Sequence, residues 1–169
     1  SPLPEVDFPT LGWQIADWIE TFLCHGPGDV EGDAFEVDDE IAAFIAWCYR
    51  VHSEGEDEEG RRQVQRAILS RPKGRAKSEI AGAIVCAEAL GPVRFSHWAE
   101  KGEVSDWGYE FAEGEPVGKP VRSPYIRCLA TEEDQSGNTY DNVVSMLTQG
   151  LAGEHFGLKM GKEVGITRV

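Results

Sequence analysis

The sequence has no long apolar run, and no stretch approaches the roughly 18–20 apolar residues that a membrane span needs. The sequence predicts no secretory signal either, because a charged start, an apolar stretch and a small-residue cleavage site do not follow one another. With 41% hydrophobic and 9% aromatic residues among its 169, the chain still has enough apolar material for a core. We therefore expect one compact domain and no membrane partner.

The sequence also lacks the usual spacings of metal and disulfide sites. The four cysteines lie far apart without a C-x-x-C pair, and the four histidines contain no H-x-x-x-H pair. Each cysteine has apolar neighbours. These features favour buried free thiols in a reducing compartment over a disulfide or zinc framework.

The charge is strongly negative but unevenly distributed. A net charge of −14 argues against a protein that binds nucleic acid regardless of sequence. However, residues 29–59 hold twelve carboxylates and one base, whereas residues 61–77 hold seven bases and no acid. The average charge hides this contrast, so the basic stretch needs a separate explanation.

Hydrophobic periodicity predicts four helices, and short apolar runs predict three strands. With right-handed crossovers, the alternation of strand and helix predicts an α/β fold with a parallel sheet and flanking helices. The stretch 92–124, rich in Gly, Glu and aromatic residues, is interpreted as an insertion that could form a small hairpin. The helices are predicted at 11–23, 38–48, 79–90 and 138–150, and the strands at 64–70, 125–130 and 164–169.

The loop between the first predicted strand and the following helix carries the chemistry. A phosphate-binding loop needs small residues, a lysine that reaches the phosphates, and a hydroxyl for Mg²⁺ at the helix start. Lys77 and Ser78 supply the last two, but Ala76 and Arg71 stand where the common pattern has glycine. A solvated basic turn is the alternative interpretation.

The context of the loop favours phosphate binding. A strand before it and a helix after it are what a phosphate-binding loop requires. Pro72 and Gly74 favour a tight, fixed conformation over a mobile one.

Three segments, LGWQIADWIE, AILSRPKGRAKSEIAGAIVCAEALGPV and SPYIRCLATEEDQSGNTYDNV, closely resemble the N-terminal ATPase region of tailed-bacteriophage terminase large subunits. Such proteins are the motors that package DNA into proheads. The resemblance implies a P-loop NTPase-like fold that uses ATP and Mg²⁺. It also implies a ring of copies working in the host bacterial cytoplasm, transiently at the portal vertex, with double-stranded DNA, the portal protein and the small terminase subunit.

The resemblance further implies a division into two parts. Residues 1–62 would form a helical segment with an adenine-reading motif, and residues 63–169 the ATPase core. The family's strand with paired carboxylates, which hold Mg²⁺ and activate the attacking water, has no counterpart in this sequence. We therefore expect little or no hydrolysis by this chain alone.

Carried over residue by residue, the resemblance makes Lys77 the phosphate lysine and Ser78 the Mg²⁺ hydroxyl. Gln14 would read the adenine edge, with Trp13 as a flat face for the base or a core residue. Gln135 would sense the γ-phosphate or cap the next helix. The remaining candidates are Lys73, Arg71 and Arg75 as transition-state charges or solvated bases, and Pro72, Gly74, Ala76 and Glu79 as nucleotide-binding positions.

Two other functions fit parts of the sequence. A non-enzymatic module could dock onto proteins through the acidic residues 29–59 and exposed aromatics of the insertion. A small-molecule phosphotransferase would need its own catalytic carboxylate near the loop and a substrate pocket, and the sequence indicates neither.

Overall fold

A computed structural model describes residues 6–72, 76–129, 133–160 and 166–168. Residue contacts divide the chain into two units, each built from three separate segments. The first unit comprises residues 1–18, 37–68 and 91–122, and the second comprises residues 19–36, 69–90 and 123–169. The functional division at residue 62 stays a prediction.

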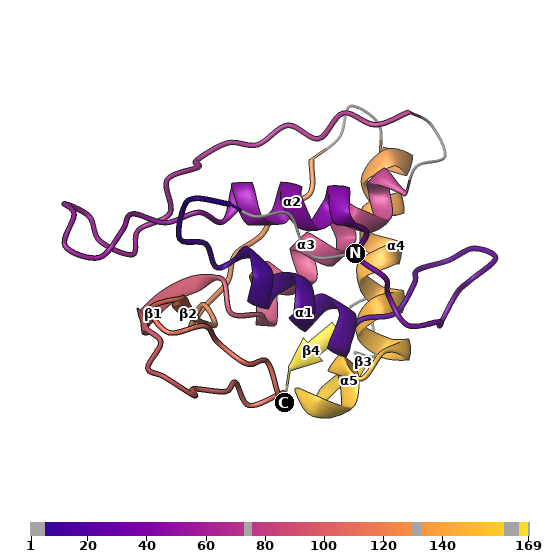
Figure 1. The fold of residues 1–169 in the computed structure, drawn as a ribbon. Coiled ribbons are helices and arrows are strands. Elements are labelled where there is room, and N and C mark those ends of the chain that lie inside the picture. The colour runs from indigo at the N-terminus through magenta and orange to yellow at the C-terminus, as the bar shows by residue number, and fades with distance from the viewer. Residues whose placement is uncertain (1–5, 73–75, 130–132, 161–165, 169) are drawn as a thin grey trace. The chain divides into compact units, whose positions relative to one another are not determined.

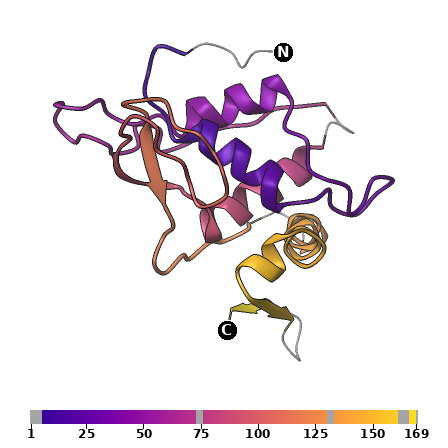
Figure 2. The same ribbon diagram turned by 60° about the horizontal axis from the view of Figure 1, so that its bottom comes forward.

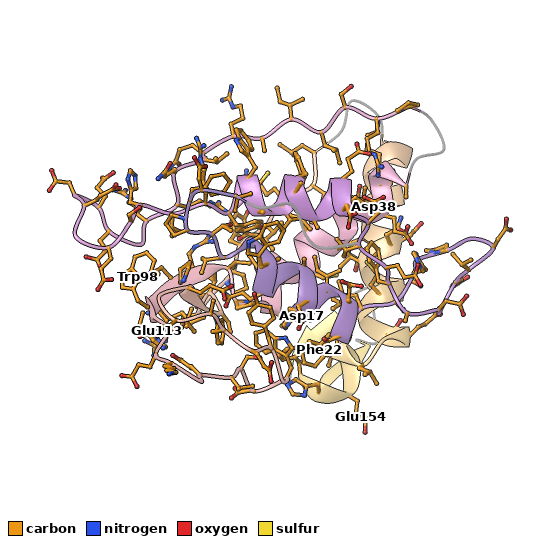
Figure 3. The ribbon with its side chains drawn as sticks, in the orientation of Figure 1. Asp17, Phe22, Asp38, Trp98, Glu113 and Glu154 are labelled. Carbon is orange, nitrogen blue, oxygen red and sulfur yellow. The ribbon has the colours of Figure 1, made fainter. Side chains whose placement is uncertain are left out.

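The four predicted helices are confirmed, with shifts at some of their ends (Figure 1). At the start of the first helix, Thr10 Oγ1 accepts a hydrogen bond from the Gly12 amide at 2.9 Å. Asp38 caps the second helix by accepting from the Ile41 amide at 2.8 Å (Figure 3). The helices are α1 (Gly12–Phe22), α2 (Asp39–Cys48), α3 (Lys77–Leu90) and α4 (Glu133–Gln149), followed by the short, unpredicted α5 (Ala152–His155).

The predicted parallel sheet, and with it the P-loop NTPase-like α/β fold, is wrong. The strands in the described part of the chain form two separate two-stranded sheets, and both are antiparallel. One pairs β1 (Arg94–Trp98) with β2 (Pro116–Lys119), and the other pairs β3 (Leu158–Met160) with β4 (Ile166–Arg168). Figure 2 shows the second pair following α5. Of the three predicted strands, only the last coincides with an observed one, β4.

The other two predicted strands show no strand pairing wherever the structure describes them. Residues 64–70 and 125–129 belong to no ladder. A strand is stabilised by its neighbour, which satisfies its backbone groups and covers its side chains. Here Ile68 is 84% exposed and Leu129 is 87% exposed, so these apolar runs lack that cover in this structure.

In the first unit, α1 and α2 approach each other very closely. Thr10 Oγ1 donates to the Ala46 carbonyl oxygen at 2.6 Å, and the Leu11 amide donates to Tyr49 O at 3.1 Å. A Cβ atom on Gly12 would lie 2.3 Å from Ala46 Cα, a distance that real structures do not show. The absence of a side chain at Gly12 is therefore what permits this packing.

The hairpin predicted within 92–124 is present as the β1–β2 pair. Its long connection folds back to form a small core of Ala99, Phe111 and Val117, covered by Tyr109. The Tyr109 hydroxyl donates to Glu115 Oε1 at 2.7 Å, and burial raises the pKa of the Glu115 carboxyl. The connection is thus held by its own contacts.

Gln14 of α1 joins the hairpin to the helix. Its Nε2 donates to Pro116 O at 2.6 Å, and its Oε1 accepts from the Gly118 amide at 2.8 Å. Trp107 adds a second link, since its Nε1 donates to Asp17 Oδ2 at 2.9 Å. The Gln14 side chain is completely buried, so its two hydrogen bonds replace those it would make with water.

In the second unit, α3 packs against α4. Space between them is limited, because a Cβ atom on Gly82 would lie 2.9 Å from Asn142 Cβ. The turn that follows α1 is attached to α4 through Glu31, whose Oε1 accepts from Gln149 Nε2 at 2.7 Å. Two helices and this turn thus form the frame of the second unit.

The cysteines are all free, as predicted, but they differ in exposure. Cys24 and Cys86 are buried, and burial raises the pKa of the Cys86 thiol to about 12. Cys48 is half-buried, whereas Cys128 is exposed, so the prediction of a buried thiol is wrong there. Cys128 lies in the unpaired segment 125–129, which explains its exposure.

Candidate functional site

The second unit contains a pocket of about 470 Å³ at the N-terminal end of α3. Its volume lies in the range of small-molecule sites, roughly 300–1,000 Å³. The walls come from three segments: the turn after α1, the start of α3, and α4. The lining residues are Gly26, Pro27, Gly28, Val30, Pro72, Ala76, Lys77, Ser78, Glu79 and Asn142.

The start of α3 provides the features that suit an anion. Lys77 and Ser78 are its first two residues, and both are exposed in the pocket wall. Amide groups in the first turn of a helix have no partners within the helix, and the helix dipole adds positive potential there. An ammonium and a hydroxyl beside such a helix end are a suitable set for phosphate oxygens.

Ala76, directly before α3, has an unusual backbone conformation. Its φ is 51°, in the left-handed region that favours glycine, and its carbonyl oxygen accepts the Ile80 amide at 2.9 Å. The common phosphate-loop pattern has glycine at this position. The chain therefore keeps a glycine-type conformation although the residue is alanine.

We expect Ala76→Gly to stabilise the second unit by about 0.5 kcal/mol. Relief of the left-handed strain, roughly 1–2 kcal/mol, exceeds the added entropy of the unfolded chain, about 0.4–1 kcal/mol. Thermal unfolding followed by circular dichroism measures the change. Ala81→Gly, at a regular position in α3, is the matched control and should cost about 1 kcal/mol. If Ala76→Gly and Ala81→Gly lost the same stability, the backbone strain at Ala76 would be refuted.

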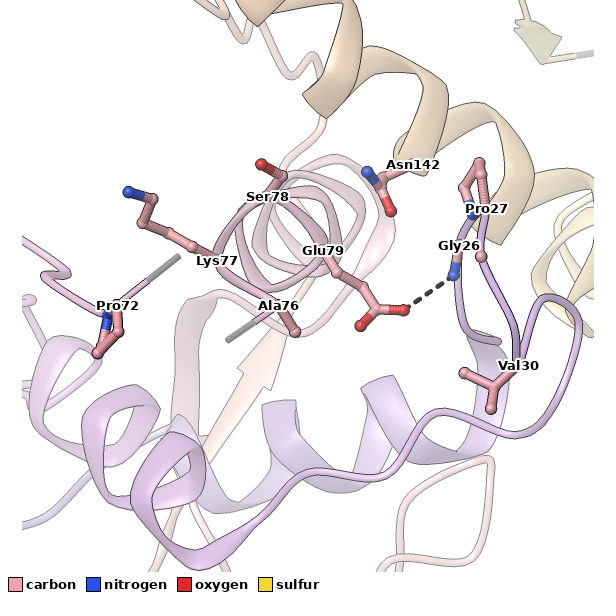
Figure 4. A pocket seen from close by; sticks show the side chains of 10 residues that line it. Gly26, Pro27, Val30, Pro72, Ala76, Lys77, Ser78, Glu79 and Asn142 are labelled. Atoms are coloured by element: carbon pink, nitrogen blue, oxygen red, sulfur yellow. Dashed lines mark hydrogen bonds between the residues drawn. The ribbon is translucent and has the colours of Figure 1, made fainter. Parts of the chain in front are cut away.

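Glu79 is turned toward the opposite wall of the pocket. Its Oε1 accepts from His25 Nδ1 at 2.8 Å and from the Gly26 amide at 3.0 Å. Figure 4 shows Lys77 and Glu79 leaving the first turn of α3 in different directions, with Glu79 pointing to Gly26 and Lys77 pointing away from it. The Glu79 carboxylate is thus hydrogen-bonded to the turn, while the Lys77 ammonium lies on the other side of the helix start.

The Asn142 side chain of α4 lies against the turn at Gly26. A Cβ atom on Gly26 would lie 2.0 Å from Asn142 Oδ1, so the Asn142 amide would have to move to admit a side chain there. Val30 and Pro27 contribute the apolar part of the lining. This wall combines backbone and apolar groups, as most small-molecule sites do.

The structure brings some of the predicted site residues together. Pro72, Ala76, Lys77, Ser78 and Glu79 line the pocket, whereas Arg71 is described but does not line it. Lys73, Gly74 and Arg75 lie outside the described residues. Gln135 lies in the first turn of α4, and its side chain is likewise outside what the structure describes.

Gln14 and Trp13 belong to the first unit. Both ends of the Gln14 amide are engaged by Pro116 and Gly118 of β2. To read the edge of an adenine, the amide would have to exchange these partners for the base. The adenine-reading role of Gln14 stays a prediction.

Sequence reasoning missed the second wall of the pocket, formed by Gly26, Pro27, Gly28, Val30 and Asn142. In the sequence, the Gly-Pro-Gly run at residues 26–28 indicates only the end of the first helix. No local pattern connects it to α3, which begins about fifty residues later in the chain.

The pocket residues fit a polyphosphate better than a metal held by protein alone. Among the described residues, no group of three or more His, Cys, Asp or Glu side chains is placed to hold a metal ion. Mg²⁺ in nucleotide sites commonly takes one or two protein ligands besides phosphate oxygens and water. The Ser78 hydroxyl would supply such a ligand.

Comparisons with known proteins point to bacteriophages. The chain is 27% identical over 172 aligned positions to the Gene 13 protein of Mycobacterium phage L5, covering 90% of this chain and 26% of that protein. It is 26% identical over 164 positions to the Gene 13 protein of Mycobacterium phage D29, covering 86% and 25%. The chain thus spans about a quarter of these curated relatives.

No protein-family profile matches the chain, and no solved structure does. Within the described part of the chain, none of the helices has the length and apolar character for crossing a bilayer.

Proposed function

We propose that this chain is the nucleotide-binding part of a bacteriophage DNA-packaging ATPase of the terminase type. The observation that carries the proposal is the pocket at the start of α3, where Lys77 and Ser78 stand beside the helix N-terminus. The resemblance of three segments to terminase large subunits and the similarity to phage proteins support it.

In this proposal the pocket binds the phosphates of ATP. The first-turn amides of α3 and the Lys77 ammonium would stabilise the phosphate charges, and Ser78 would hold Mg²⁺. Hydrolysis needs a carboxylate that activates water, and the sequence places none at a strand end near the loop. We therefore propose binding without substantial turnover for this chain alone.

The whole protein, about four times as long in the phage relatives, would do the mechanical work. We propose that it acts as a ring in the host cytoplasm, with double-stranded DNA, the portal protein and the small terminase subunit as partners.

Protein docking through the acidic residues is the less favoured alternative. That function relies on exposed aromatic side chains in the insertion. Phe111 is buried, and Trp98, Trp107 and Tyr109 are only partly exposed and hydrogen-bonded within the first unit. The aromatics thus serve the hairpin itself.

Binding of Mg-ATP to the 169-residue chain tests the proposal. We expect ATP to raise the Tm, because a ligand at about 100 times its Kd stabilises the native state by roughly 2.7 kcal/mol. Lys77→Ala should weaken binding about tenfold, the loss of one charge-assisted contact. Calorimetry gives the Kd.

Lys101→Ala is the matched control, since it removes an exposed lysine outside the pocket. It should bind ATP as the wild-type chain does. The proposal fails if millimolar ATP leaves the wild-type Tm unchanged, or if Lys77→Ala and Lys101→Ala bind equally.

A further inference from the structure

The contact between Glu79 and the turn after α1 stands out because one carboxylate oxygen serves two successive residues. Oε1 accepts from the His25 ring at 2.8 Å and from the Gly26 amide at 3.0 Å. Side-chain exposure is only 20% for His25 and 18% for Glu79. Such shielded, charge-assisted bonds are stronger than those of an exposed ion pair.

The contact also indicates which nitrogen of the His25 ring carries a hydrogen. A carboxylate oxygen accepts this bond, so Nδ1 is assigned as the donor. The ring is stacked on Phe35, with 5.0 Å between the centroids and 25° between the planes. Phe35 is buried, and its amide donates to Leu23 O at 3.3 Å. The His25 ring therefore has two neighbours: Phe35 is stacked on its face, and Glu79 is hydrogen-bonded to Nδ1 at its edge.

The turn itself is closed by backbone bonds. The His25 amide donates to Asp33 O at 2.8 Å, and the Gly32 amide donates to His25 O at 3.1 Å. Glu31 attaches one part of the turn to α4 through Gln149, and Glu79 attaches another part to α3. A preformed turn with two acidic anchors keeps Gly26 to Gly28 in the pocket wall.

Direct contact between Glu79 and the phosphates of a nucleotide is less favourable than its contact with the turn. An ionised carboxylate has no hydrogen to donate to a phosphate oxygen, and like charges repel. Its Oε1 already accepts two hydrogen bonds on the side of the pocket opposite to Lys77 (Figure 4). A carboxylate in this position acts on the pocket through the turn that it holds.

We propose that Glu79 is a positioning residue, whose carboxylate holds the His25–Gly28 turn against α3 as the second wall of the phosphate pocket. The inference rests on the proposed function, since it names how that same site is kept in shape. It differs from the sequence-based interpretation, in which Glu79 contacts the nucleotide, and from a role as Mg²⁺ ligand.

Two measurements on Glu79→Ala, Glu79→Gln and Glu154→Ala test this role. The first is hydrogen exchange of the Gly26 amide without any nucleotide. Glu79→Ala should accelerate it at least about tenfold, because the Gly26 amide loses its charge-assisted hydrogen bond. Glu79→Gln keeps an acceptor oxygen and should remain within about threefold of wild type. Glu154 is an exposed carboxylate of α5 in the same unit, so Glu154→Ala should change nothing.

The second measurement is the Kd of ATP with Mg²⁺, and of ATP and pyrophosphate in EDTA. A positioning role predicts that Glu79→Ala weakens all three about equally, by about fivefold, whereas Glu79→Gln restores most of the affinity. A loss confined to the Mg²⁺ series would make Glu79 a metal ligand and overturn the inference. If Glu79→Ala bound these ligands as tightly as Glu154→Ala does, the positioning role would be overturned as well, while the proposed function would stand.

Failure of the proposed function has a different signature. If wild type binds neither ATP nor pyrophosphate, that function falls, and Gly26 exchange alone decides whether Glu79 holds the turn. Unchanged exchange in Glu79→Ala would then overturn the anchoring role too. Circular dichroism of each variant shows whether the helices are intact.

Discussion

Replacing Gly12 by alanine should destabilise the first unit by about 3 kcal/mol, at the upper end of ordinary overpacking. The added Cβ would lie 2.3 Å from Ala46 Cα and 2.6 Å from Ala46 N. Both atoms belong to the backbone of α2, so no side chain can rotate away. In an unhindered helix the same substitution is favourable by about 0.8–1.0 kcal/mol, so the expected sign is reversed. Urea unfolding followed by tryptophan fluorescence measures the loss.

Gly102→Ala provides the control for Gly12→Ala. Nothing lies within 4 Å of a Cβ at Gly102, but its φ is +81°. Only backbone strain opposes that substitution, at roughly 1–2 kcal/mol. If Gly12→Ala proved as stable as wild type, the close approach of α1 and α2 would be refuted. A cost equal to that of Gly102→Ala would mean that the helices separate easily.

The helices could be predicted because their signals are local. Thr10 and Asp38 stand directly before apolar periodic segments, and each makes the capping bond that its residue type favours. The start of α4 was misplaced at Asn138, five residues after its observed start at Glu133. Residues 133–137 read EDQSG and contain no apolar side chain, so apolar periodicity gives no signal for this part of the helix.

The sheet could not be predicted, because a strand depends on residues outside its own segment. Residues 64–70 and 125–129 are short apolar runs whose length and composition suit a buried strand. Whether such a run pairs depends on a neighbouring strand, which can come from any part of the chain. In the described structure neither run has one, and Ile68 and Leu129 remain exposed. The rule of right-handed crossovers applies only where a parallel sheet exists. It therefore could not show that these two segments form no strands.

Only one wall of the candidate site could be predicted, because only that wall has a local pattern in the sequence. Lys77 and Ser78 are recognisable at the start of a helix, since a helix N-terminus with a basic residue is a local pattern. The opposite wall depends on contacts between distant parts of the chain, such as His25 with Glu79 and Gly26 with Asn142. The positioning role proposed for Glu79 depends on the same distant contacts.

Gln14 offers the second large effect, because its buried amide makes one hydrogen bond as donor and one as acceptor. In Gln14→Glu, an ionised carboxylate would still accept from the Gly118 amide but would face the Pro116 carbonyl oxygen without a hydrogen. A buried charge that lacks a partner costs about 3–5 kcal/mol, which is the loss we expect at pH 7. A protonated carboxyl can replace both bonds, so the loss should largely disappear in acid.

The sign of this pH dependence follows from linkage. Burial raises the pKa of the introduced carboxyl in the folded state above its unfolded value of about 4.3. Stability relative to wild type is therefore fully present below that value, and it falls by up to about 1.4 kcal/mol per pH unit as the pH rises toward the folded pKa. Urea unfolding of both chains at pH 5, 6 and 7 gives the difference, in which the titration of all other groups largely cancels.

Gln14→Leu separates the charge from the lost hydrogen bonds. It leaves Pro116 O and the Gly118 amide without the Gln14 partner, which costs about 1–3 kcal/mol for each group at every pH. A Gln14→Glu deficit that is the same at pH 5 and pH 7 would show that the carboxylate reaches water, and that α1 and β2 are not joined through a buried amide. A deficit that grows with pH, beside a constant one for leucine, would establish Gln14 as the link that holds the hairpin to the first helix. The stability lost in Gln14→Leu would then also estimate the free energy needed to break these two hydrogen bonds. Gln14 would have to supply that free energy if it left β2 to contact a nucleotide base.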